Sequence, residues 1–293
     1  MARCAAIFLI TLLLVPFGGR ADAERTRFSV RAVLPQNQMD AELSYFYLEM
    51  QPNQTQTLRV SIRNDDSRDI FINVQANTAF SNASGTIDYS ASQGRNTENG
   101  IDFQSLITLP ESRVLVPAHG QAYAEFVLQM PEEGFDGELL GGLVFTREEE
   151  PEEAPPKSET TGGMKVRHVF NYCIAVRLTQ GRPIPQEADE PKLMDVQIGE
   201  KAGFPALIVL ANNAQPRILK DMRMDIHLYP QNANNAVVSF KDLTVSMAPY
   251  STMPYTILLR EENALQPGSY RALVTLQLEE EIWNYETMLV SGA

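Results

Sequence analysis

The side chains that could do chemistry are sparse in this sequence and far apart. The histidines are His119, His168 and His227, and none has the close His or Cys spacing that binds zinc. The chain has no Gly-x-Ser-x-Gly turn and no phosphate-binding glycine loop. Cys173 lies in an alternating segment, where filling space beside a core is the simpler role. We therefore expect no catalytic residue, no metal and no cofactor, and predict that the protein is not an enzyme.

Carboxylates are abundant, but they cluster in charged segments. The run Glu279-Glu280-Glu281 lies between two expected strands and is typical of a solvated hairpin loop. A glycosidase needs two carboxylates at a defined separation across a cleft, which neighbouring loop residues do not supply. The formal net charge is −13, and an acidic surface argues against nucleic acid as a partner.

The elements that must carry any site are predicted to be strands. Apolar and polar residues alternate in short segments separated by Gly, Pro, Asn and Asp. The clearest segments are 58–62, 70–76, 126–130, 170–178, 222–228 and 272–278. Similar strands, turns and strand-ending asparagines recur in the same order in both halves of the chain. The pattern predicts an all-β protein made of two tandem immunoglobulin-like β-sandwiches.

Composition divides the chain into five segments. Residues 1–23 combine an early positive charge, a short apolar stretch and small residues, which is the layout of a secretory signal peptide. Residues 24–180 form the first predicted domain, which includes a mobile acidic, proline-rich loop at 148–163. A linker at 181–191 precedes the second domain at 192–293. We expect an exported protein without a disulfide, because the leader contains one of the two cysteines.

Candidate ligand-binding residues lie near the start of the first domain. If Phe46 faces the core, Tyr45 and Tyr47 must face outward, because side chains alternate along a strand. Exposed tyrosines offer contact area and a hydrogen bond, and they are common in carbohydrate and protein contacts. Tyrosines on an edge strand without any ligand remain an equal alternative. With Asn37 and Gln38 just before them, they are the predicted site.

Ordered sequence runs extend this interpretation. They include Pro52-Asn-Gln-Thr-Gln-Thr-Leu-Arg-Val60, Phe135-Asp-Gly137-Glu-Leu-Leu-Gly141-Gly142 and Pro267-Gly268-Ser269-Tyr270, with further runs at 28–38, 45–48, 77–89, 130–131, 172–178 and 248–251. In this order they resemble the WxL-interacting protein family over nearly the whole chain that follows the leader. The resemblance implies an amino-terminal peptidoglycan-binding domain and a second, immunoglobulin-like domain that binds host extracellular proteins. It also implies WxL-domain surface proteins as partners on a Gram-positive cell wall.

The chain departs from the family at its end. Family members usually have a carboxy-terminal membrane helix, whereas no apolar run follows the last expected strand here. We therefore expect the protein on the cell wall or secreted, without a transmembrane anchor in this chain.

Two functions from different classes follow. The first is a cell-wall-associated binding and scaffold protein that binds peptidoglycan, partners WxL-type surface proteins and adheres to host proteins. The alternative is a periplasmic pilus-type assembly chaperone with two immunoglobulin-like domains. Such a chaperone needs an exposed edge strand and a basic cleft, and the acidity of this chain counts against it.

Overall fold

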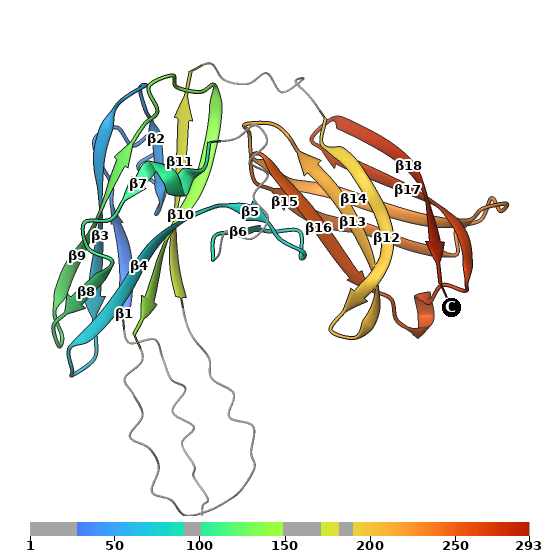
Figure 1. The fold of residues 1–293 in the computed structure, drawn as a ribbon, viewed down its shortest axis with the longest axis horizontal. Helices are drawn as coiled ribbons and strands as arrows, with labels where there is room; N and C mark the ends of the chain where they lie inside the picture. Colours follow the sequence, from blue (N-terminus) through green and yellow to red (C-terminus); the bar gives the residue numbers. More distant parts are fainter. Residues whose placement is uncertain (1–27, 91–100, 149–170, 182–189, 293) are drawn as a thin grey trace, which may run out of the picture.

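Two β-sandwiches make up the described part of this chain (Figure 1). The computed structural model describes residues 28–90, 101–148, 171–181 and 190–292. The predicted leader, nearly all of the acidic loop and most of the linker lie outside these residues. Among the helices of the described residues, none is long and apolar enough to cross a membrane. The all-β class predicted from the alternating segments is confirmed.

The first sandwich packs a sheet of four strands against a sheet of five. The four-stranded sheet has the order β1 (Phe28–Val33), β3 (Thr55–Asn64), β9 (Gln121–Gln129) and β7 (Ile107–Thr108). The other sheet has the order β2 (Phe46–Glu49), β11 (Asn171–Gln180), β10 (Gly137–Arg147), β4 (Ile70–Thr78) and β8 (Arg113–Val116). Neighbours are antiparallel, except that β2 runs parallel to β11. A short 3-10 helix, η1 (Phe103–Leu106), precedes β7.

The second sandwich repeats this plan with seven strands. One sheet has the order β12 (Lys192–Lys201), β13 (Phe204–Asn213) and β16 (Ser251–Leu258). The other has the order β15 (Val238–Met247), β14 (Leu219–Pro230), β17 (Gly268–Leu278) and β18 (Glu281–Ser291), and η2 (Glu261–Asn263) follows β16. These orders match β1-β3-β9 and β8-β4-β10-β11. The first sandwich therefore has the same seven strands, with β2 and β7 added.

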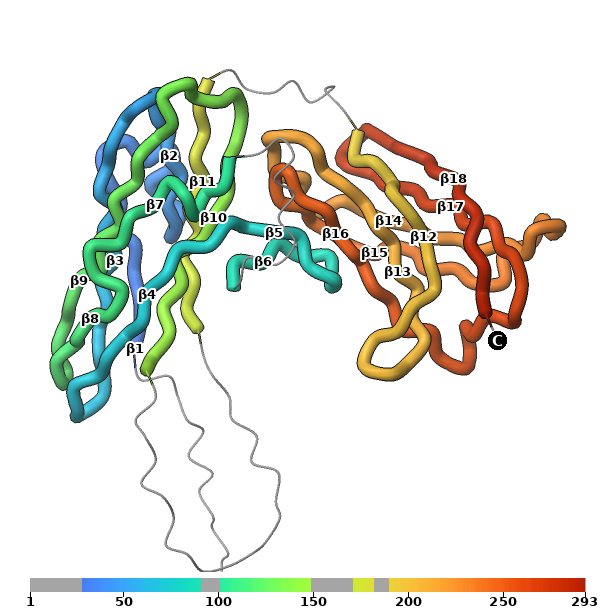
Figure 2. The backbone as a smooth tube through the Cα atoms, in the orientation of Figure 1, coloured from blue at the N-terminus to red at the C-terminus, as the bar shows by residue number. Residues whose placement is uncertain are grey.

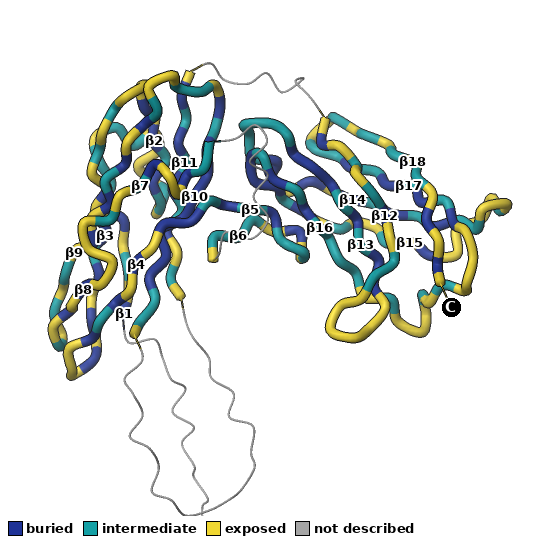
Figure 3. Tube along the Cα trace, viewed as in Figure 1, coloured by how far each residue is buried: buried dark blue, intermediate teal, exposed yellow. Residues whose placement is uncertain are grey.

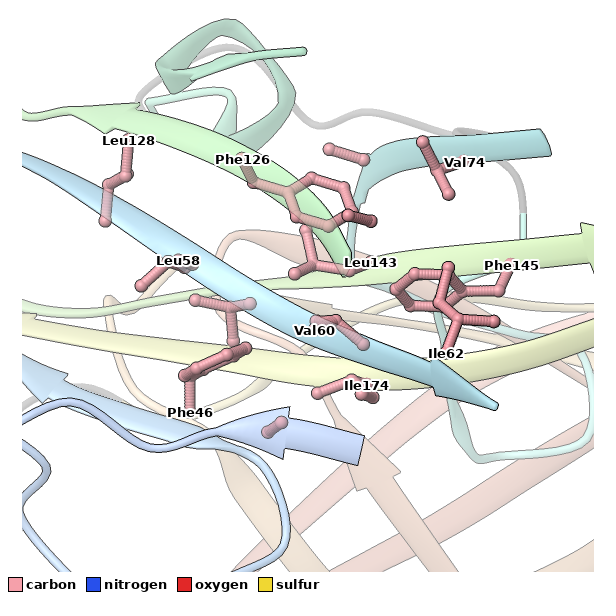
Figure 4. Close-up of a cluster of buried hydrophobic side chains, with 14 of the residues drawn as sticks. Phe46, Leu58, Val60, Ile62, Val74, Phe126, Leu128, Leu143, Phe145 and Ile174 are labelled. Atoms are coloured by element: carbon pink, nitrogen blue, oxygen red, sulfur yellow. The ribbon is translucent and has the colours of Figure 1, made fainter. Parts of the chain in front are cut away.

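Each sandwich has its own apolar core. Figure 4 shows inward-facing side chains of β3, β9 and β10 meeting between the sheets of the first sandwich. Phe126 and Phe145 pack edge to face there, with ring centroids 5.9 Å apart, a favourable geometry for aromatic pairs. Figure 3 shows burial alternating along the strands, as expected when one face of each strand lies in a core.

A buried asparagine, Asn64, ends β3 in the first sandwich. The Asn64 side chain has no exposed surface. Its Nδ2 donates to the carbonyls of Arg68, Val116 and Pro117 at 2.7, 3.2 and 3.0 Å. The amide therefore joins the loop after β3 to the turn after β8, and it satisfies carbonyl groups in a place with little access to water.

Asn213 has the same place and role in the second sandwich. It ends β13, is fully buried, and donates to the carbonyls of Arg217 and Ala248 at 2.8 and 2.9 Å. The strand-ending asparagines of the sequence pattern thus correspond to one structural device that is used twice.

The turns held by these asparagines also share a backbone conformation. His119 and Tyr250 adopt left-handed conformations, with φ of 52° and 50°. The His119 N–H donates to the Asp66 carbonyl at 3.0 Å, and the Tyr250 N–H donates to the Gln215 carbonyl at 3.1 Å. His119 therefore has an identifiable structural place, at a turn that closes the sandwich.

An arm from the first sandwich reaches the second (Figure 2). This interdomain arm, residues 79–89, follows β4 and contains the hairpin of β5 (Phe80–Ser81) and β6 (Ile87–Asp88). Asn77 Nδ2 donates to the carbonyls of Tyr89 and Ser90 at 2.7 and 3.1 Å. The end of the arm is thereby held against the strand from which it left.

Ser81 is the main polar contact of the interdomain arm. Its N–H donates to Ser251 Oγ at 2.8 Å, and its Oγ accepts from the Ala248 N–H at 3.0 Å. Ala79, Leu140 and Ala248 form a small buried apolar cluster beside these bonds. The contact therefore combines satisfied polar groups with dry packing, as a stable domain interface requires.

The tip of the interdomain arm makes two more main-chain contacts. The carbonyls of Ala83 and Gly85 accept from the N–H groups of Thr256 and Ser246 at 2.9 and 2.8 Å. Because Thr256 lies on β16 and Ser246 on β15, the arm covers edges of both sheets of the second sandwich.

Replacing either buried asparagine should destabilise the protein. We expect Asn64→Ala and Asn213→Ala each to lower the free energy of unfolding by about 1–3 kcal/mol, because buried carbonyls lose their donor. Denaturation by urea measures this. Asn235→Ala, at an exposed turn, is the control, and an equal midpoint for all three variants would contradict the role of the buried amides.

A side chain at Gly85 should loosen the contact between the sandwiches. A Cβ there would lie 2.7 Å from Val245 Cγ1 and 2.8 Å from Tyr255 Cε2. Gly203 is a matched control, because it has a similar φ, +80° against +75°, but no atom lies within 4 Å of the added Cβ. We expect Gly85→Val to increase the radius of gyration in X-ray scattering and Gly203→Val not to. Equal scattering from both variants would show that the arm does not hold the sandwiches together.

Candidate functional site

The segment before β2 is held by side-chain hydrogen bonds. Gln38 Nε2 donates to the Tyr45 carbonyl at 3.0 Å, and its Oε1 accepts from the Tyr47 N–H at 3.1 Å. Asn37 and Gln56 exchange two amide hydrogen bonds of 2.9 Å. The structure therefore brings Gln38 together with both predicted tyrosines, and it places Asn37 beside β3. Both amides use their polar groups to position this segment.

Tyr47 alternates outward from the buried residues of β2, as predicted, whereas Tyr45 also packs against the core of the first sandwich. Phe46 and Leu48 are fully buried in the core, while the two tyrosines are half-buried. The Arg177 guanidinium carbon lies 4.3 Å from the centre of the Tyr47 ring, within the range of a cation–π contact. We call the outer face of β2, β11 and β10 around these residues the tyrosine face.

Arg177 forms an ion pair with Glu138 on the neighbouring strand. Arg177 Nη2 donates to Glu138 Oε1, and both side chains are largely shielded from solvent. Burial alone would lower the pKa of Arg177, but the hydrogen bond and charge of Glu138 raise it above its ordinary value, with smaller contributions from Tyr47 and Tyr45. The guanidinium is therefore a fixed positive charge on an otherwise acidic protein.

Glu138 also contacts the second sandwich. Its Oε2 accepts from the Ile218 N–H at 3.1 Å, and its own N–H donates to the Pro216 carbonyl at 2.7 Å. One carboxylate therefore bonds to a residue of each sandwich, and the tyrosine face lies directly beside the contact between them.

Tyr89 and Cys173 extend the tyrosine face toward the interdomain arm. A Cβ on Gly142 would lie 2.7 Å from both Cys173 Sγ and Tyr89 Cβ, so the glycine leaves room for both side chains. Burial, and then the neighbouring Cys173 and Tyr45, raise the pKa of Tyr89 to about 12. Burial of the thiol and then the charge of Asp88 raise the pKa of Cys173 to about 12. Both groups are neutral at physiological pH.

The described residues contain no group of three His, Cys, Asp or Glu side chains placed to hold a metal ion. His227 Nδ1 lies 2.8 Å from Ser239 Oγ on the surface, and Asp225 is paired with Arg223. His168 lies outside the described residues.

Sequence reasoning missed three residues of the tyrosine face. Arg177, Glu138 and Tyr89 come from three distant segments. The register of β10, β11 and β2 brings Arg177 and Glu138 beside Tyr47, and the end of the interdomain arm brings Tyr89. Alternation places Arg177 on the outward side of its strand, but it does not say that β2 lies alongside in parallel.

Comparison with solved structures finds distant likenesses to fimbrial chaperones. The CFA/I chaperone–tip adhesin complex includes a chain with 10% identity and a TM-score of 0.35, with coverage of 88% of this chain and 97% of that chain. The CupB2 chaperone of Pseudomonas aeruginosa has 14% identity, a TM-score of 0.27, and coverage of 80% and 92%. The E. coli chaperone DraB has 12% identity, a TM-score of 0.31, and coverage of 91% and 98%. TM-scores this low carry no argument about function.

Sequence comparison is more informative. No curated protein is similar enough to match. Residues 28–147 match the model of the WxL Interacting Protein, peptidoglycan binding domain, and residues 161–290 match that of the WxL Interacting Protein, host binding domain. The second match begins before β11, which the structure places in a sheet of the first sandwich. Since these two matches follow each other along most of the chain, the protein belongs to the WxL-interacting protein family.

Proposed function

We propose that this protein binds peptidoglycan through its first sandwich and works as a scaffold on the cell wall. The observation that carries the proposal is the match of residues 28–147 to a peptidoglycan binding domain. The second sandwich takes host extracellular proteins, in keeping with the host binding domain matched at 161–290. WxL-domain surface proteins are its partners, as the name of the family implies.

The tyrosine face is the proposed contact with the wall. Aromatic rings provide flat apolar area and a hydroxyl, which suits sugar rings and peptide units. Arg177 holds the ring of Tyr47 in place, and Gln38 fixes the backbone on both sides of Phe46. A rigid contact surface loses little conformational entropy when it binds. In this site Tyr45 and Tyr47 touch the ligand, and Asn37 and Gln38 position them.

Domain organisation and location follow from the same proposal. Residues 24–180 form the wall-binding domain, 181–191 the linker and 192–293 the second domain, after export directed by residues 1–23. The protein is retained at the cell surface by the wall it binds. A pilus-type chaperone gains no argument from the distant structural likenesses.

Replacing both tyrosines should weaken wall binding. We expect Tyr45→Ala with Tyr47→Ala to bind isolated Gram-positive cell walls about tenfold more weakly, because two contact rings are lost. Pelleting of the purified protein with increasing amounts of wall measures this.

Tyr123→Ala is the matched control for that experiment. Tyr123 is exposed on the other sheet and also lies beneath an arginine, with Arg59 4.5 Å from its ring centre. Unchanged binding by the double variant would reject the tyrosine face, and no binding by the unaltered protein would reject the wall as ligand.

A protein that works by binding needs no reactive thiol. Because the pKa of Cys173 is about 12 instead of 9.0, its thiolate fraction at pH 8 should be about a thousandfold below that of an ordinary thiol. We expect slow labelling by iodoacetamide in protein lacking residues 1–23, and fast labelling in urea. Equal rates in both conditions, followed by mass spectrometry, would contradict a raised pKa at Cys173, whose residue the structure gives as exposed.

A further inference from the structure

One edge of the second sandwich has no strand beside it. β18 is the last strand of its sheet, and among the described residues no strand pairs with its outer edge. The interdomain arm bonds to β15, at the opposite end of the same sheet. The outer edge of β18 therefore keeps N–H and C=O groups with which another strand could pair.

The first sandwich shows how such an edge can be filled. β11 has the place in its sheet that β18 has in the second sandwich, and β2 pairs in parallel with residues 176–179 of β11. Phe46 and Leu48 of β2 are fully buried. A short extended segment with alternate apolar residues thus completes this edge in the first sandwich.

The chain enters the two sandwiches in different ways. β1 pairs with β3 only as far as Val33, and the chain then crosses to the other sheet, where it forms β2. β12 instead stays beside β13 along its whole length, from Lys192 to Lys201. Within the described residues, the second sandwich therefore has no strand of its own in the place that β2 takes in the first.

The unfilled stretch of β18 is residues 287–290, which we call the open edge. β10 and β17 each begin with a glycine, which pairs with the last residue of β11 and of β18, respectively. Aligned from this shared end, the open edge corresponds to residues 176–179 of β11, the stretch that β2 covers. The buried Leu289 then has the place of the buried Leu178.

The side chains of the open edge indicate what it would bind. Met288 and Val290 point outward and are 49% and 70% exposed, although the outer face of an antiparallel sheet is usually polar. Residues 287–290 carry no charge, and Glu286 just before them is paired with Arg271 at 3.4 Å. The open edge therefore favours an uncharged segment with apolar side chains. A second copy of this chain is disfavoured, because each copy has a formal net charge of −13.

We propose that the open edge binds an extended, uncharged segment of a host extracellular protein. The segment adds to the sheet as a strand parallel to β18, in the place that β2 takes in the first sandwich. Main-chain hydrogen bonds provide affinity, and contacts with Met288 and Val290 select apolar side chains. The inference rests on the proposed host-protein binding of the second sandwich and identifies the part of that sandwich that makes the contact.

A synthetic strand peptide tests the open edge directly. The probe is acetyl-Lys-Val-Thr-Val-Thr-Val-Lys-amide, and the control has proline as its central residue, because proline has no N–H to donate. We expect the probe, and not the proline peptide, to slow hydrogen exchange of the amides at 287–290 in the full protein. Mass spectrometry measures the exchange. Equal exchange with and without the probe would overturn the proposal.

Substitutions at the two exposed residues give a second test. We expect Met288→Lys with Val290→Lys to bind the probe about tenfold more weakly, because two apolar cross-strand contacts are lost. Ile282→Lys is the matched control, since Ile282 lies on the same face of β18 and is 56% exposed but lies outside the open edge. An equal loss of binding in the control would show that the peptide does not recognise the open edge.

Binding to immobilised extracellular matrix from cultured fibroblasts separates this inference from host binding itself. If the double variant binds the matrix as well as the unaltered protein does, the open edge is wrong and host binding stands. If the unaltered protein does not bind the matrix, both proposals fail. Analytical ultracentrifugation tests the other occupant: a dimer that the double variant abolishes would assign the open edge to a second copy and overturn the proposal.

Discussion

The arrangement of the two sandwiches depends on hydrogen bonds that cross between them, some between main-chain groups and some through serine hydroxyls. Ser81, Ala83 and Gly85 supply the groups that pair with β15, β16 and the turn between these strands. These strand edges would otherwise leave N–H groups without protein partners, and exposed edges invite pairing with other chains. The interdomain arm satisfies them from within the same molecule. The protein thereby protects the second sandwich and fixes it beside the first in one step.

Glu138 forms a second contact between the two sandwiches, and it lies beside the proposed wall-binding surface. Its two carboxylate oxygens face Arg177 on one side and the Ile218 N–H on the other. Any ligand that moves Arg177 on the tyrosine face must also change a contact with the second sandwich. Shielded ion pairs cannot lose one partner cheaply, because the remaining charge would be left in a poorly solvated place. The first sandwich therefore presents its proposed wall contact from a surface that is rigid on both sides.

Much of the fold follows from local sequence patterns, and much of the site does not. Alternation predicts the strands and the orientation of Tyr45 and Tyr47, because it depends only on neighbours along the chain. The repeated asparagines predict equivalent strand ends, which Asn64 and Asn213 confirm. From sequence alone the interdomain arm cannot be distinguished from an ordinary loop, because the residues that it contacts lie more than 160 positions away. Two contacts of the site cannot be predicted without the three-dimensional arrangement of the strands. They are the hydrogen bond between Gln38 and the Tyr47 backbone and the contact of Arg177 with the Tyr47 ring.

The shared plan of the two sandwiches separates structural residues from functional candidates. Asn64 and Asn213, like His119 and Tyr250, occupy equivalent places and serve the same turns in both sandwiches. Such residues are explained by the fold alone. By contrast β2 and the interdomain arm have no equivalent among the seven strands common to both. Side chains that the common plan does not require are the ones free to serve binding. Tyr47 lies on that added strand and Tyr45 directly precedes it.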